Sequence, residues 1–149
     1  MKNLEDLEKR INSELTTKIN KSEIKHNQIY IETDKDDLID ICLFLKTNNY
    51  TKFRQLIDIT VVDYPERNQR FELVYLFLSH EFNQRLVLKY SISENEVITS
   101  LTNIFPSSNW MEREVFDMYG VSFKDHPDLR RILTDYGFKG HPLRKDFPL

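Results

Sequence analysis

The residues that could do chemistry lie mostly after position 108. His126 and His141 each precede a proline, and the carboxylates of Glu112, Glu114 and Asp117 could imitate an acid/base group. A histidine can bind a metal or relay a proton, but no second ligand lies at metal-binding spacing. We therefore favour histidines that fix turns through backbone hydrogen bonds. Because no nucleophile or cofactor motif accompanies the acids, the sequence predicts no catalytic residue in this chain.

The single cysteine, Cys42, limits the cofactors that the chain could hold. An iron–sulfur cluster needs about four thiolates, and a structural zinc ion needs about three or four Cys or His ligands. Cys42 also continues a helical apolar pattern with Leu38, Ile41 and Leu45, which is typical of a small buried residue. The sequence thus predicts neither a redox cofactor nor a metal site.

Four cations near the end of the chain, Arg130, Arg131, Arg144 and Lys145, could bind an anion or a lipid headgroup. Residues 109–149 nevertheless contain seven acidic and seven basic side chains, so the segment is neutral. This balance favours charge pairing within a protein interface over an anion site.

A helix is predicted from Asn109, its N-cap, to Gly120, its C-terminal stop. Glu112 falls on the apolar face of this helix, where an unpaired carboxylate would be costly. We therefore expect Glu112 to pair with a cation from the tail. The candidates are Arg130, Arg131 and Arg144.

The opposite face of that helix is predicted to be charged, with Arg113, Glu114 and Asp117 turned outward. Trp110 lies on this side, so we interpret it as an anchor for a loop or a partner protein.

Residues 137–149 follow neither helical nor strand periodicity, although Phe138, Leu143 and Phe147 are spaced through them. All three glycines of the chain lie in its last thirty residues, which indicates a shaped irregular path. Such a segment is either disordered or drapes over another protein. The aromatic residues favour draping, because disordered segments normally contain few of them.

Upstream, periodicity predicts helices over 2–20 and after Asp34, and strands over 23–32, 57–61, 71–78 and 86–92. Ser93 and Glu96 suggest a capping box that starts a short helix ending at Pro106. The fold class is therefore α+β, with a mixed, mainly antiparallel sheet of about four strands, packed helices and an extended irregular C-terminal tail. We divide it into an α+β domain, 1–120, and an interface segment of the same domain, 121–149.

The composition excludes some function classes. A net charge of -3 argues against a general nucleic-acid binder, and no stretch approaches the roughly 18–20 apolar residues that span a bilayer. The acidic N-terminus differs from a transit peptide or a secretory signal, so we expect a bacterial, organelle-encoded or processed protein.

The C-terminal segment resembles the 30-kilodalton subunit family of respiratory complex I, also called the C subunit or subunit 9 of NADH dehydrogenase. Weaker similarity extends the resemblance upstream to about residue 55. The matching residues are Trp110, Glu112 to Glu114, Asp117, Gly120, Phe123, His126-Pro127, Leu129 to Leu133, Asp135 to Phe138 and Gly140 to Pro148. Family members usually continue past the equivalent of Leu149, so we expect either loss of that extension or its supply by another chain.

The resemblance implies a non-redox scaffold in the peripheral arm of NADH:ubiquinone oxidoreductase, packed against the 49-kilodalton subunit and iron–sulfur subunits. FMN and iron–sulfur clusters are expected on other subunits. The implied location is the matrix side of the mitochondrial inner membrane or the cytoplasmic face of a bacterial membrane. The alternatives are a scaffold of a related hydrogenase or ferredoxin-driven complex and a small standalone enzyme.

The residues expected at the partner interface come from the helix that precedes the tail and from the tail itself. They are Trp110, Glu112, Arg113, His126, Arg130, Arg131, Tyr136, Phe138, His141, Leu143, Arg144, Lys145 and Phe147.

Overall fold

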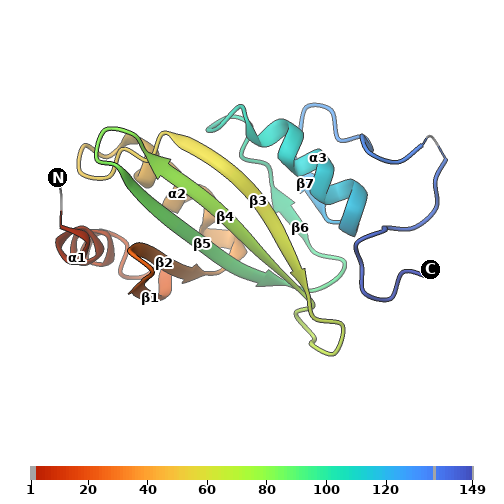
Figure 1. The fold of residues 1–149 in the computed structure, drawn as a ribbon, viewed down its shortest axis with the longest axis horizontal. Helices are drawn as coiled ribbons and strands as arrows, with labels where there is room; N and C mark the ends of the chain where they lie inside the picture. The colour runs from red at the N-terminus through yellow and green to blue at the C-terminus, as the bar shows by residue number, and fades with distance from the viewer. Residues whose placement is uncertain (1–2, 136, 149) are drawn as a thin grey trace. The chain divides into compact units, whose positions relative to one another are not determined.

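The structure, a computed structural model, describes residues 3–135 and 137–148. Figure 1 shows how the helices and strands within these residues follow one another along the chain. In chain order they are α1 (Leu4–Glu14), β1 (Ile19–Lys25), β2 (Gln28–Thr33), the 3-10 helix η1 (Lys35–Asp37), α2 (Leu38–Thr47), β3 (Gln55–Asp63), β4 (Phe71–Ser79), β5 (Gln84–Ile92), β6 (Val97–Thr99), α3 (Ser108–Tyr119) and β7 (Ser122–Lys124). None of the helices in the described ranges is long and apolar enough to cross a membrane.

The main sheet has five strands in the order β1-β2-β5-β4-β3. Strands β1 and β2 are antiparallel, whereas β2 and β5 are parallel, so the sheet is mixed. Strands β6 and β7 form a separate parallel pair. The predicted α+β class and the strands over 57–61, 71–78 and 86–92 are confirmed, but the sheet has one strand more than expected.

The additional strand comes from the region predicted as one strand over 23–32. The chain turns back at His26 and Asn27, which take positive φ values of 51° and 59°. The turn was missed because neither residue is glycine, although Asn tolerates the left-handed region better than most residues. The first helix, predicted over 2–20, is also shorter than expected. It ends at Glu14 because the chain enters β1 at Ile19.

The prediction of a short helix that starts at Ser93 is wrong. The Ser93 amide does donate to Glu96 Oε1 at 2.7 Å, and the Glu96 amide donates to the Ser93 carbonyl at 3.2 Å. These bonds close only a turn, after which Val97–Thr99 pairs with Ser122–Lys124. Pairing with a distant strand therefore prevails over the local helical signal.

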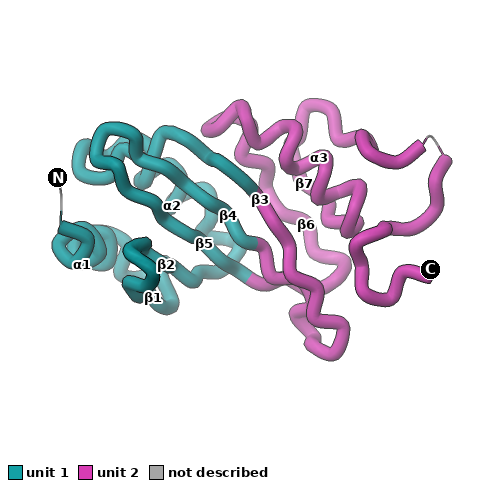
Figure 2. Tube along the Cα trace, viewed as in Figure 1, with its two compact units in different colours: residues 1–58, 74–90 teal, residues 59–73, 91–149 magenta. Residues whose placement is uncertain are grey.

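The chain forms two compact units, which Figure 2 distinguishes by colour. Unit 1 comprises residues 1–58 and 74–90, and unit 2 comprises residues 59–73 and 91–149. In unit 1, α1 contributes Leu7 and Ile11 to a buried core. Helix α2 adds Leu38, Ile41, Cys42 and Leu45, and the strands add Ile29, Ile31, Tyr75, Phe77, Leu86 and Leu88.

Unit 2 contains helix α3, the β6–β7 pair and the C-terminal segment. Its core is made of side chains from α3, from the β6–β7 pair and the loops beside them, and from the ends of the long strands. They include Ile59, Val61, Phe71, Leu73, Ile98, Leu101, Phe105, Val115, Met118, Val121 and Phe123. After Lys124 no helix or strand occurs among the described residues, which confirms the predicted irregular tail.

Candidate partner-binding surface

Helix α3 is the rigid element on which the candidate surface is built. It ends at Gly120, which has φ 77° and whose amide donates to the Phe116 carbonyl at 2.8 Å. This left-handed position favours glycine, because a side chain there is strained. The predicted C-terminal stop is confirmed, but the N-cap is Ser107 instead of Asn109, so the helix begins at Ser108.

Asp117 organises the segment that follows the helix, a role the sequence prediction missed. It was expected to face outward, but it is fully buried. Its Oδ1 accepts from Arg131 Nε and Thr134 Oγ1, each at 2.6 Å. Its Oδ2 accepts from the amides of Ile132, Leu133 and Thr134 at 2.7–3.1 Å. One carboxylate thus fixes the backbone of residues 132–134.

These hydrogen bonds decide the ionisation of Asp117. Burial alone raises the pKa of this carboxyl. The bonds from Thr134, Arg131 and the backbone amides outweigh burial, so the pKa lies well below its ordinary value. Asp117 is therefore ionised and compensates the charge of Arg131.

Arg131 joins helix α3 to the tail. Besides Asp117, its guanidinium donates from Nη1 to the Phe138 carbonyl at 2.9 Å and from Nη2 to the Gly140 carbonyl. Its charge also lies 5.5 Å from the centre of the Phe138 ring. The arginine was predicted to pair with a nearby acid, and it does so with Asp117.

The tail also completes the last turn of α3, whose carbonyls have no partner within the helix. His141 Nδ1 donates to the Asp117 carbonyl at 3.0 Å, and the Leu143 amide donates to the Met118 carbonyl at 3.1 Å. Arg144 Nε donates to the Tyr119 carbonyl at 2.7 Å. A cation at a helix C-terminus is favourable, because the carbonyl dipoles point toward it.

A second anchor holds the tail through Arg70 and Asp63, which are both nearly buried. Arg70 binds Asp63 through two hydrogen bonds of 2.6 and 2.9 Å. It also donates to Asp146 Oδ1 at 2.9 Å, while the Lys145 amide donates to Asp63 Oδ2 at 2.8 Å. The Arg70 hydrogen bonds hold the pKa of Asp63 below its ordinary value, against the effect of burial.

Glu94 links Arg70 of this anchor to Arg144 of the tail. Arg144 Nη1 donates to Glu94 Oε1 at 2.8 Å, and Arg70 Nη1 lies 3.5 Å from Glu94 Oε2. The segment Arg144-Lys145-Asp146 is thus tied to residues from three earlier parts of unit 2. Sequence reasoning missed Asp63, Arg70 and Glu94, although the first two lie in the upstream similarity.

The predicted ion pair of Glu112 is wrong. Glu112 is buried as expected, but its Oε2 accepts from the Leu101 amide at 2.8 Å and from Ser108 Oγ. Its Oε1 has no hydrogen-bond partner within the described ranges. A backbone amide and a hydroxyl on the preceding helical turn therefore replace the cation that the charge argument required.

The interpretation of the histidines as turn residues is confirmed for His126, whereas the His141 ring bonds a helix end instead of a turn. His126 Nδ1 accepts from the Asp128 amide at 2.9 Å, which leaves Nε2 protonated to donate to the Asn109 carbonyl at 2.9 Å. His141 donates to the end of α3, as described above. Where the structure describes the chain, no three His, Cys, Asp or Glu residues gather closely enough to hold a metal ion.

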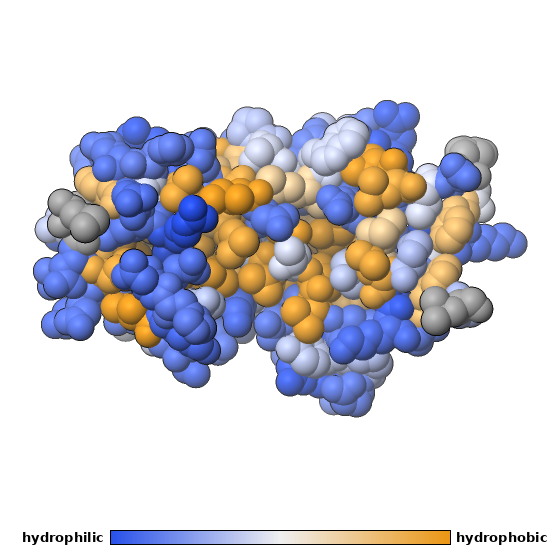
Figure 3. Space-filling model, viewed as in Figure 1, coloured by the Kyte–Doolittle hydropathy of each residue, from blue (hydrophilic) through white to orange (hydrophobic). Residues whose placement is uncertain are grey.

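An open hollow of about 550 Å³ lies beside α3 in unit 2; we call it the arginine hollow. It is lined by Arg113, Phe116, Arg130, Arg131, Thr134, Asp135, Gly137 and Phe138. Trp110 is 60 % exposed, and the Arg113 guanidinium lies 5.2 Å from the centre of its ring. Phe138 is 40 % exposed and stacks on Phe147 with the ring centres 6.1 Å apart. Figure 3 shows hydrophobic side chains interrupting the hydrophilic surface over the C-terminal segment.

The predicted interface residues thus fall into two groups. The first group stabilises unit 2 through hydrogen bonds within the chain: Glu112, His126, Arg131, His141 and Arg144. Lys145 contributes its backbone amide and lies over the Tyr64 ring. Trp110, Arg113, Arg130, Phe138, Leu143 and Phe147 remain at least partly accessible. Tyr136 lies outside the described residues.

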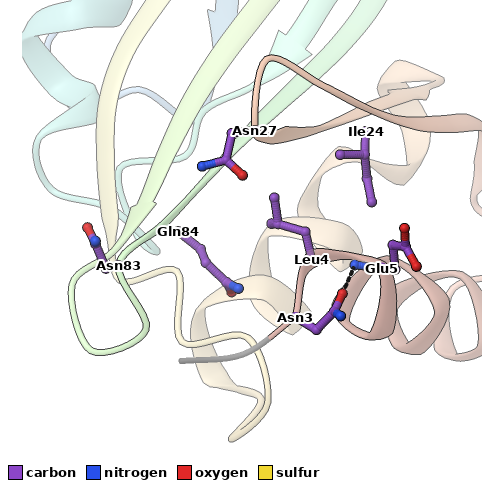
Figure 4. Close-up of a pocket in the computed structure, with 7 residues that line it drawn as sticks. All are labelled: Asn3, Leu4, Glu5, Ile24, Asn27, Asn83 and Gln84. Carbon is purple, nitrogen blue, oxygen red and sulfur yellow. Dashed lines mark hydrogen bonds between the residues drawn. The ribbon is translucent and has the colours of Figure 1, made fainter.

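Unit 1 contains a second hollow, of about 360 Å³, which Figure 4 shows. Its lining is mostly amides: Asn3, Leu4, Glu5, Ile24, Asn27, Asn83 and Gln84. Asn3 caps α1 by accepting from the Glu5 amide at 2.8 Å, and Asn27 and Asn83 occupy turns with positive φ. Because these amides have structural roles and the lining has no aromatic or arginine side chain, we regard the arginine hollow as the stronger candidate.

Comparison with known proteins identifies the family. The sequence profile described as "Respiratory-chain NADH dehydrogenase, 30 Kd subunit" matches residues 31–149. The chain belongs to this family. The residues of the tail that carried the resemblance lie within the matched range, and many of them make the anchoring bonds described above.

Two relatives show how close the match is. The chain is 52 % identical over 126 residues to the C subunit of the NADH-quinone oxidoreductase of Ruegeria pomeroyi, covering 85 % of this chain and 63 % of the relative. It is 57 % identical over 132 residues to "NADH dehydrogenase [ubiquinone] iron-sulfur protein 3" of Beta trigyna, covering 89 % and 67 %. The chain thus spans about three fifths to two thirds of these two relatives.

Two solved structures share the fold at low identity. A chain of the membrane-bound sulfane sulfur reductase, an archaeal respiratory membrane complex, has a TM-score of 0.84 at 24 % identity and covers 97 % of this chain and 85 % of its own. A trypsin-resistant fragment of Nqo5 has a TM-score of 0.67 at 23 % identity and covers 85 % and 98 %. At this level of identity, both similarities show a shared fold and nothing about function.

Proposed function

We propose that the chain is a structural subunit of the peripheral arm of an NADH:quinone oxidoreductase. The observation that carries this proposal is the C-terminal segment of unit 2. Two buried anchors hold a segment without regular structure in one conformation, and this segment presents arginine and aromatic side chains. Protein interfaces are enriched in these residue types, and a rigid support is what positions a binding surface accurately.

The proposed partners are the 49-kilodalton quinone-module subunit and the neighbouring iron–sulfur subunits. The chain would hold this module in place and so support electron transfer from NADH to quinone without carrying electrons. The names of the bacterial and plant relatives support membership of such an assembly. The proposed location is peripheral, on the matrix side of the mitochondrial inner membrane or on the cytoplasmic face of a bacterial membrane.

We further propose that this chain binds no iron–sulfur cluster, although the plant relative is named an iron-sulfur protein. The single cysteine, Cys42, is completely buried in α2 among core side chains. Burial raises the pKa of the Cys42 thiol well above its ordinary value, so it stays protonated. The clusters and FMN of the complex would then reside on other subunits.

Affinity purification of the tagged chain from membranes in mild detergent tests the proposal. We expect flavin, iron–sulfur and quinone-module subunits to copurify, together with inhibitor-sensitive NADH:quinone activity. Arg144→Ala should lower the recovered complex severalfold, because it removes the bonds to Tyr119 and Glu94. Lys139→Ala serves as the matched control, because it removes a cation that lies between the anchors and should leave recovery unchanged.

Other results would contradict the proposal. Recovery of a hydrogenase-like set of subunits would assign the chain to a related complex. A chain that is recovered alone and turns over a substrate would be a standalone enzyme.

A further inference from the structure

We propose that the arginine hollow binds an acidic loop of a neighbouring subunit, with a carboxylate on Arg113 and an apolar side chain against Phe116 and Phe138. This inference rests on the proposed function, because it presumes an assembled complex. It goes further by naming the site and the chemistry of its occupant.

The charge of Arg113 is the first observation. Arg70, Arg130, Arg131 and Arg144 each form an ion pair with a carboxylate at 2.6–2.8 Å. Where the structure describes the chain, Arg113 forms none. Its Nε donates to the Arg130 carbonyl at 3.1 Å, and this bond fixes the direction of the guanidinium.

Two acids of this region, Asp128 and Asp117, already have other cations as partners. Asp128 is held by Arg130, whose hydrogen bond is the main cause of the lowered pKa of Asp128, with only a small contribution from the charge of Arg113. Asp117 is enclosed by residues 131–134. The terminal nitrogens of Arg113 therefore remain available to a carboxylate, which a guanidinium binds with two parallel hydrogen bonds.

The apolar surroundings are the second observation. Phe116 and Phe138 line the hollow, and the exposed Trp110 ring supports Arg113 from the helix. Leu133, at 57 % exposure, lies next to the lining residue Thr134 in the chain. Arginine and phenylalanine side chains in a concavity, with a tryptophan beside the lining residue Arg113, are typical of the residues that dominate binding energy at protein interfaces.

The size and charge of the hollow favour a protein loop over a phosphate group. A volume of about 550 Å³ holds several side chains. Only one lining guanidinium lacks an ion pair, and Asp135 contributes a negative charge to the same wall. A phosphate or lipid headgroup, with its higher charge density, would be poorly neutralised here, whereas a single carboxylate matches the one unpaired cation.

Site-specific photo-crosslinking in the purified complex tests this assignment. The photoreactive residue p-benzoylphenylalanine is placed at position 110 or 138, and at position 43 as a control on the exposed Leu43 of α2 in unit 1. We expect positions 110 and 138 to crosslink to one segment of another subunit, with Asp or Glu within about four residues of the crosslink. Position 43 should not reach that segment.

Charge exchange then tests the predicted carboxylate. Arg113→Glu should reduce the crosslink yield from position 138 roughly tenfold, and Arg113→Lys should retain most of it. Replacing the identified acid by Lys in the Arg113→Glu background should restore the yield. This rescue excludes misfolding as the cause of the loss.

Several results would overturn the assignment. These are crosslinks to lipid, to a second copy of this chain or to a segment without an acid, and an unchanged yield in Arg113→Glu. If the complex is recovered while these results are obtained, only the docking assignment fails. If the tagged chain does not copurify with other subunits, the proposed function fails as well.

Discussion

At the scale of single residues, Gly120 and Gly137 offer a matched pair. Both have positive φ, 77° and 79°, so alanine is similarly strained at either position. A Cβ at Gly120 would lie 2.7 Å from His141 Nε2 and 2.8 Å from Arg144 Nη2, whereas at Gly137 nothing lies within 4 Å. The tail therefore lies so close to the C-terminus of α3 that only glycine fits at position 120 without a shift of His141 and Arg144.

We expect Gly137→Ala to lower the free energy of unfolding by about 1 kcal/mol from backbone strain. Gly120→Ala should cost at least about 1 kcal/mol more, because His141 and Arg144 must move away from the carbonyls of Asp117 and Tyr119. Urea unfolding of the full chain measures both values. Equal losses in the two variants would show that the close packing of the tail on Gly120 is unimportant.

At the scale of elements, the tail depends on ionised carboxylates. The pKa values of Asp63, Asp117 and Asp146 all lie below the ordinary value. Protons therefore bind the unfolded chain more readily than the folded one near pH 4. The stabilisation is complete above the unfolded pKa of about 4 and is lost as the pH falls through the folded values.

We expect the free energy of unfolding to be nearly constant from pH 7 to about pH 5 and to fall steeply below about pH 4. Asp63→Asn should be less stable at neutral pH and should show a shallower fall in acid. Urea titrations at several pH values provide the test, with the exchange of the Leu143 amide as a local probe. Stability that rises or stays constant below pH 4 would contradict the role of these carboxylates.

The elements also show what the sequence could predict. Alternation of apolar residues was sufficient for β3 and β5, a run that is apolar on both faces for β4, and periodicity with Gly120 for α3. The β1–β2 hairpin was missed because its turn uses His26 and Asn27 without glycine. Helical periodicity placed Glu112 on the buried face but could not show that a backbone amide and a hydroxyl would satisfy it. It placed Asp117 outward because the pattern of one helix carries no information about residues 131–134, which bury this carboxylate. Bonds such as that from Arg70 to Asp146 join distant residues and leave no local signal.

At the scale of the whole molecule, the buried thiol tests whether this chain takes part in electron transfer. Cys42 lies in the core of unit 1 with Leu38, Ile41 and Leu45, and its raised pKa opposes the thiolate that a cluster requires. Cys42→Ala in the complete complex should leave every iron–sulfur signal in the electron paramagnetic resonance spectrum unchanged. NADH:quinone activity per assembled complex should also match that of the unmodified protein.

The same variant should cost only about 1 kcal/mol in unfolding free energy, because it removes one buried heavy atom. Cys42→Ser is the matched control, since it retains the number of heavy atoms but buries a hydroxyl group, so it should be the less stable of the two. If Cys42→Ala removed one cluster signal while the amount of complex stayed the same, this chain would be a ligand-bearing subunit and the scaffold proposal would be wrong. An unchanged spectrum in an active complex would instead show that no iron–sulfur cluster uses Cys42 as a ligand. Because Cys42 is the single cysteine, this chain would then contribute to electron transfer only by holding its partners.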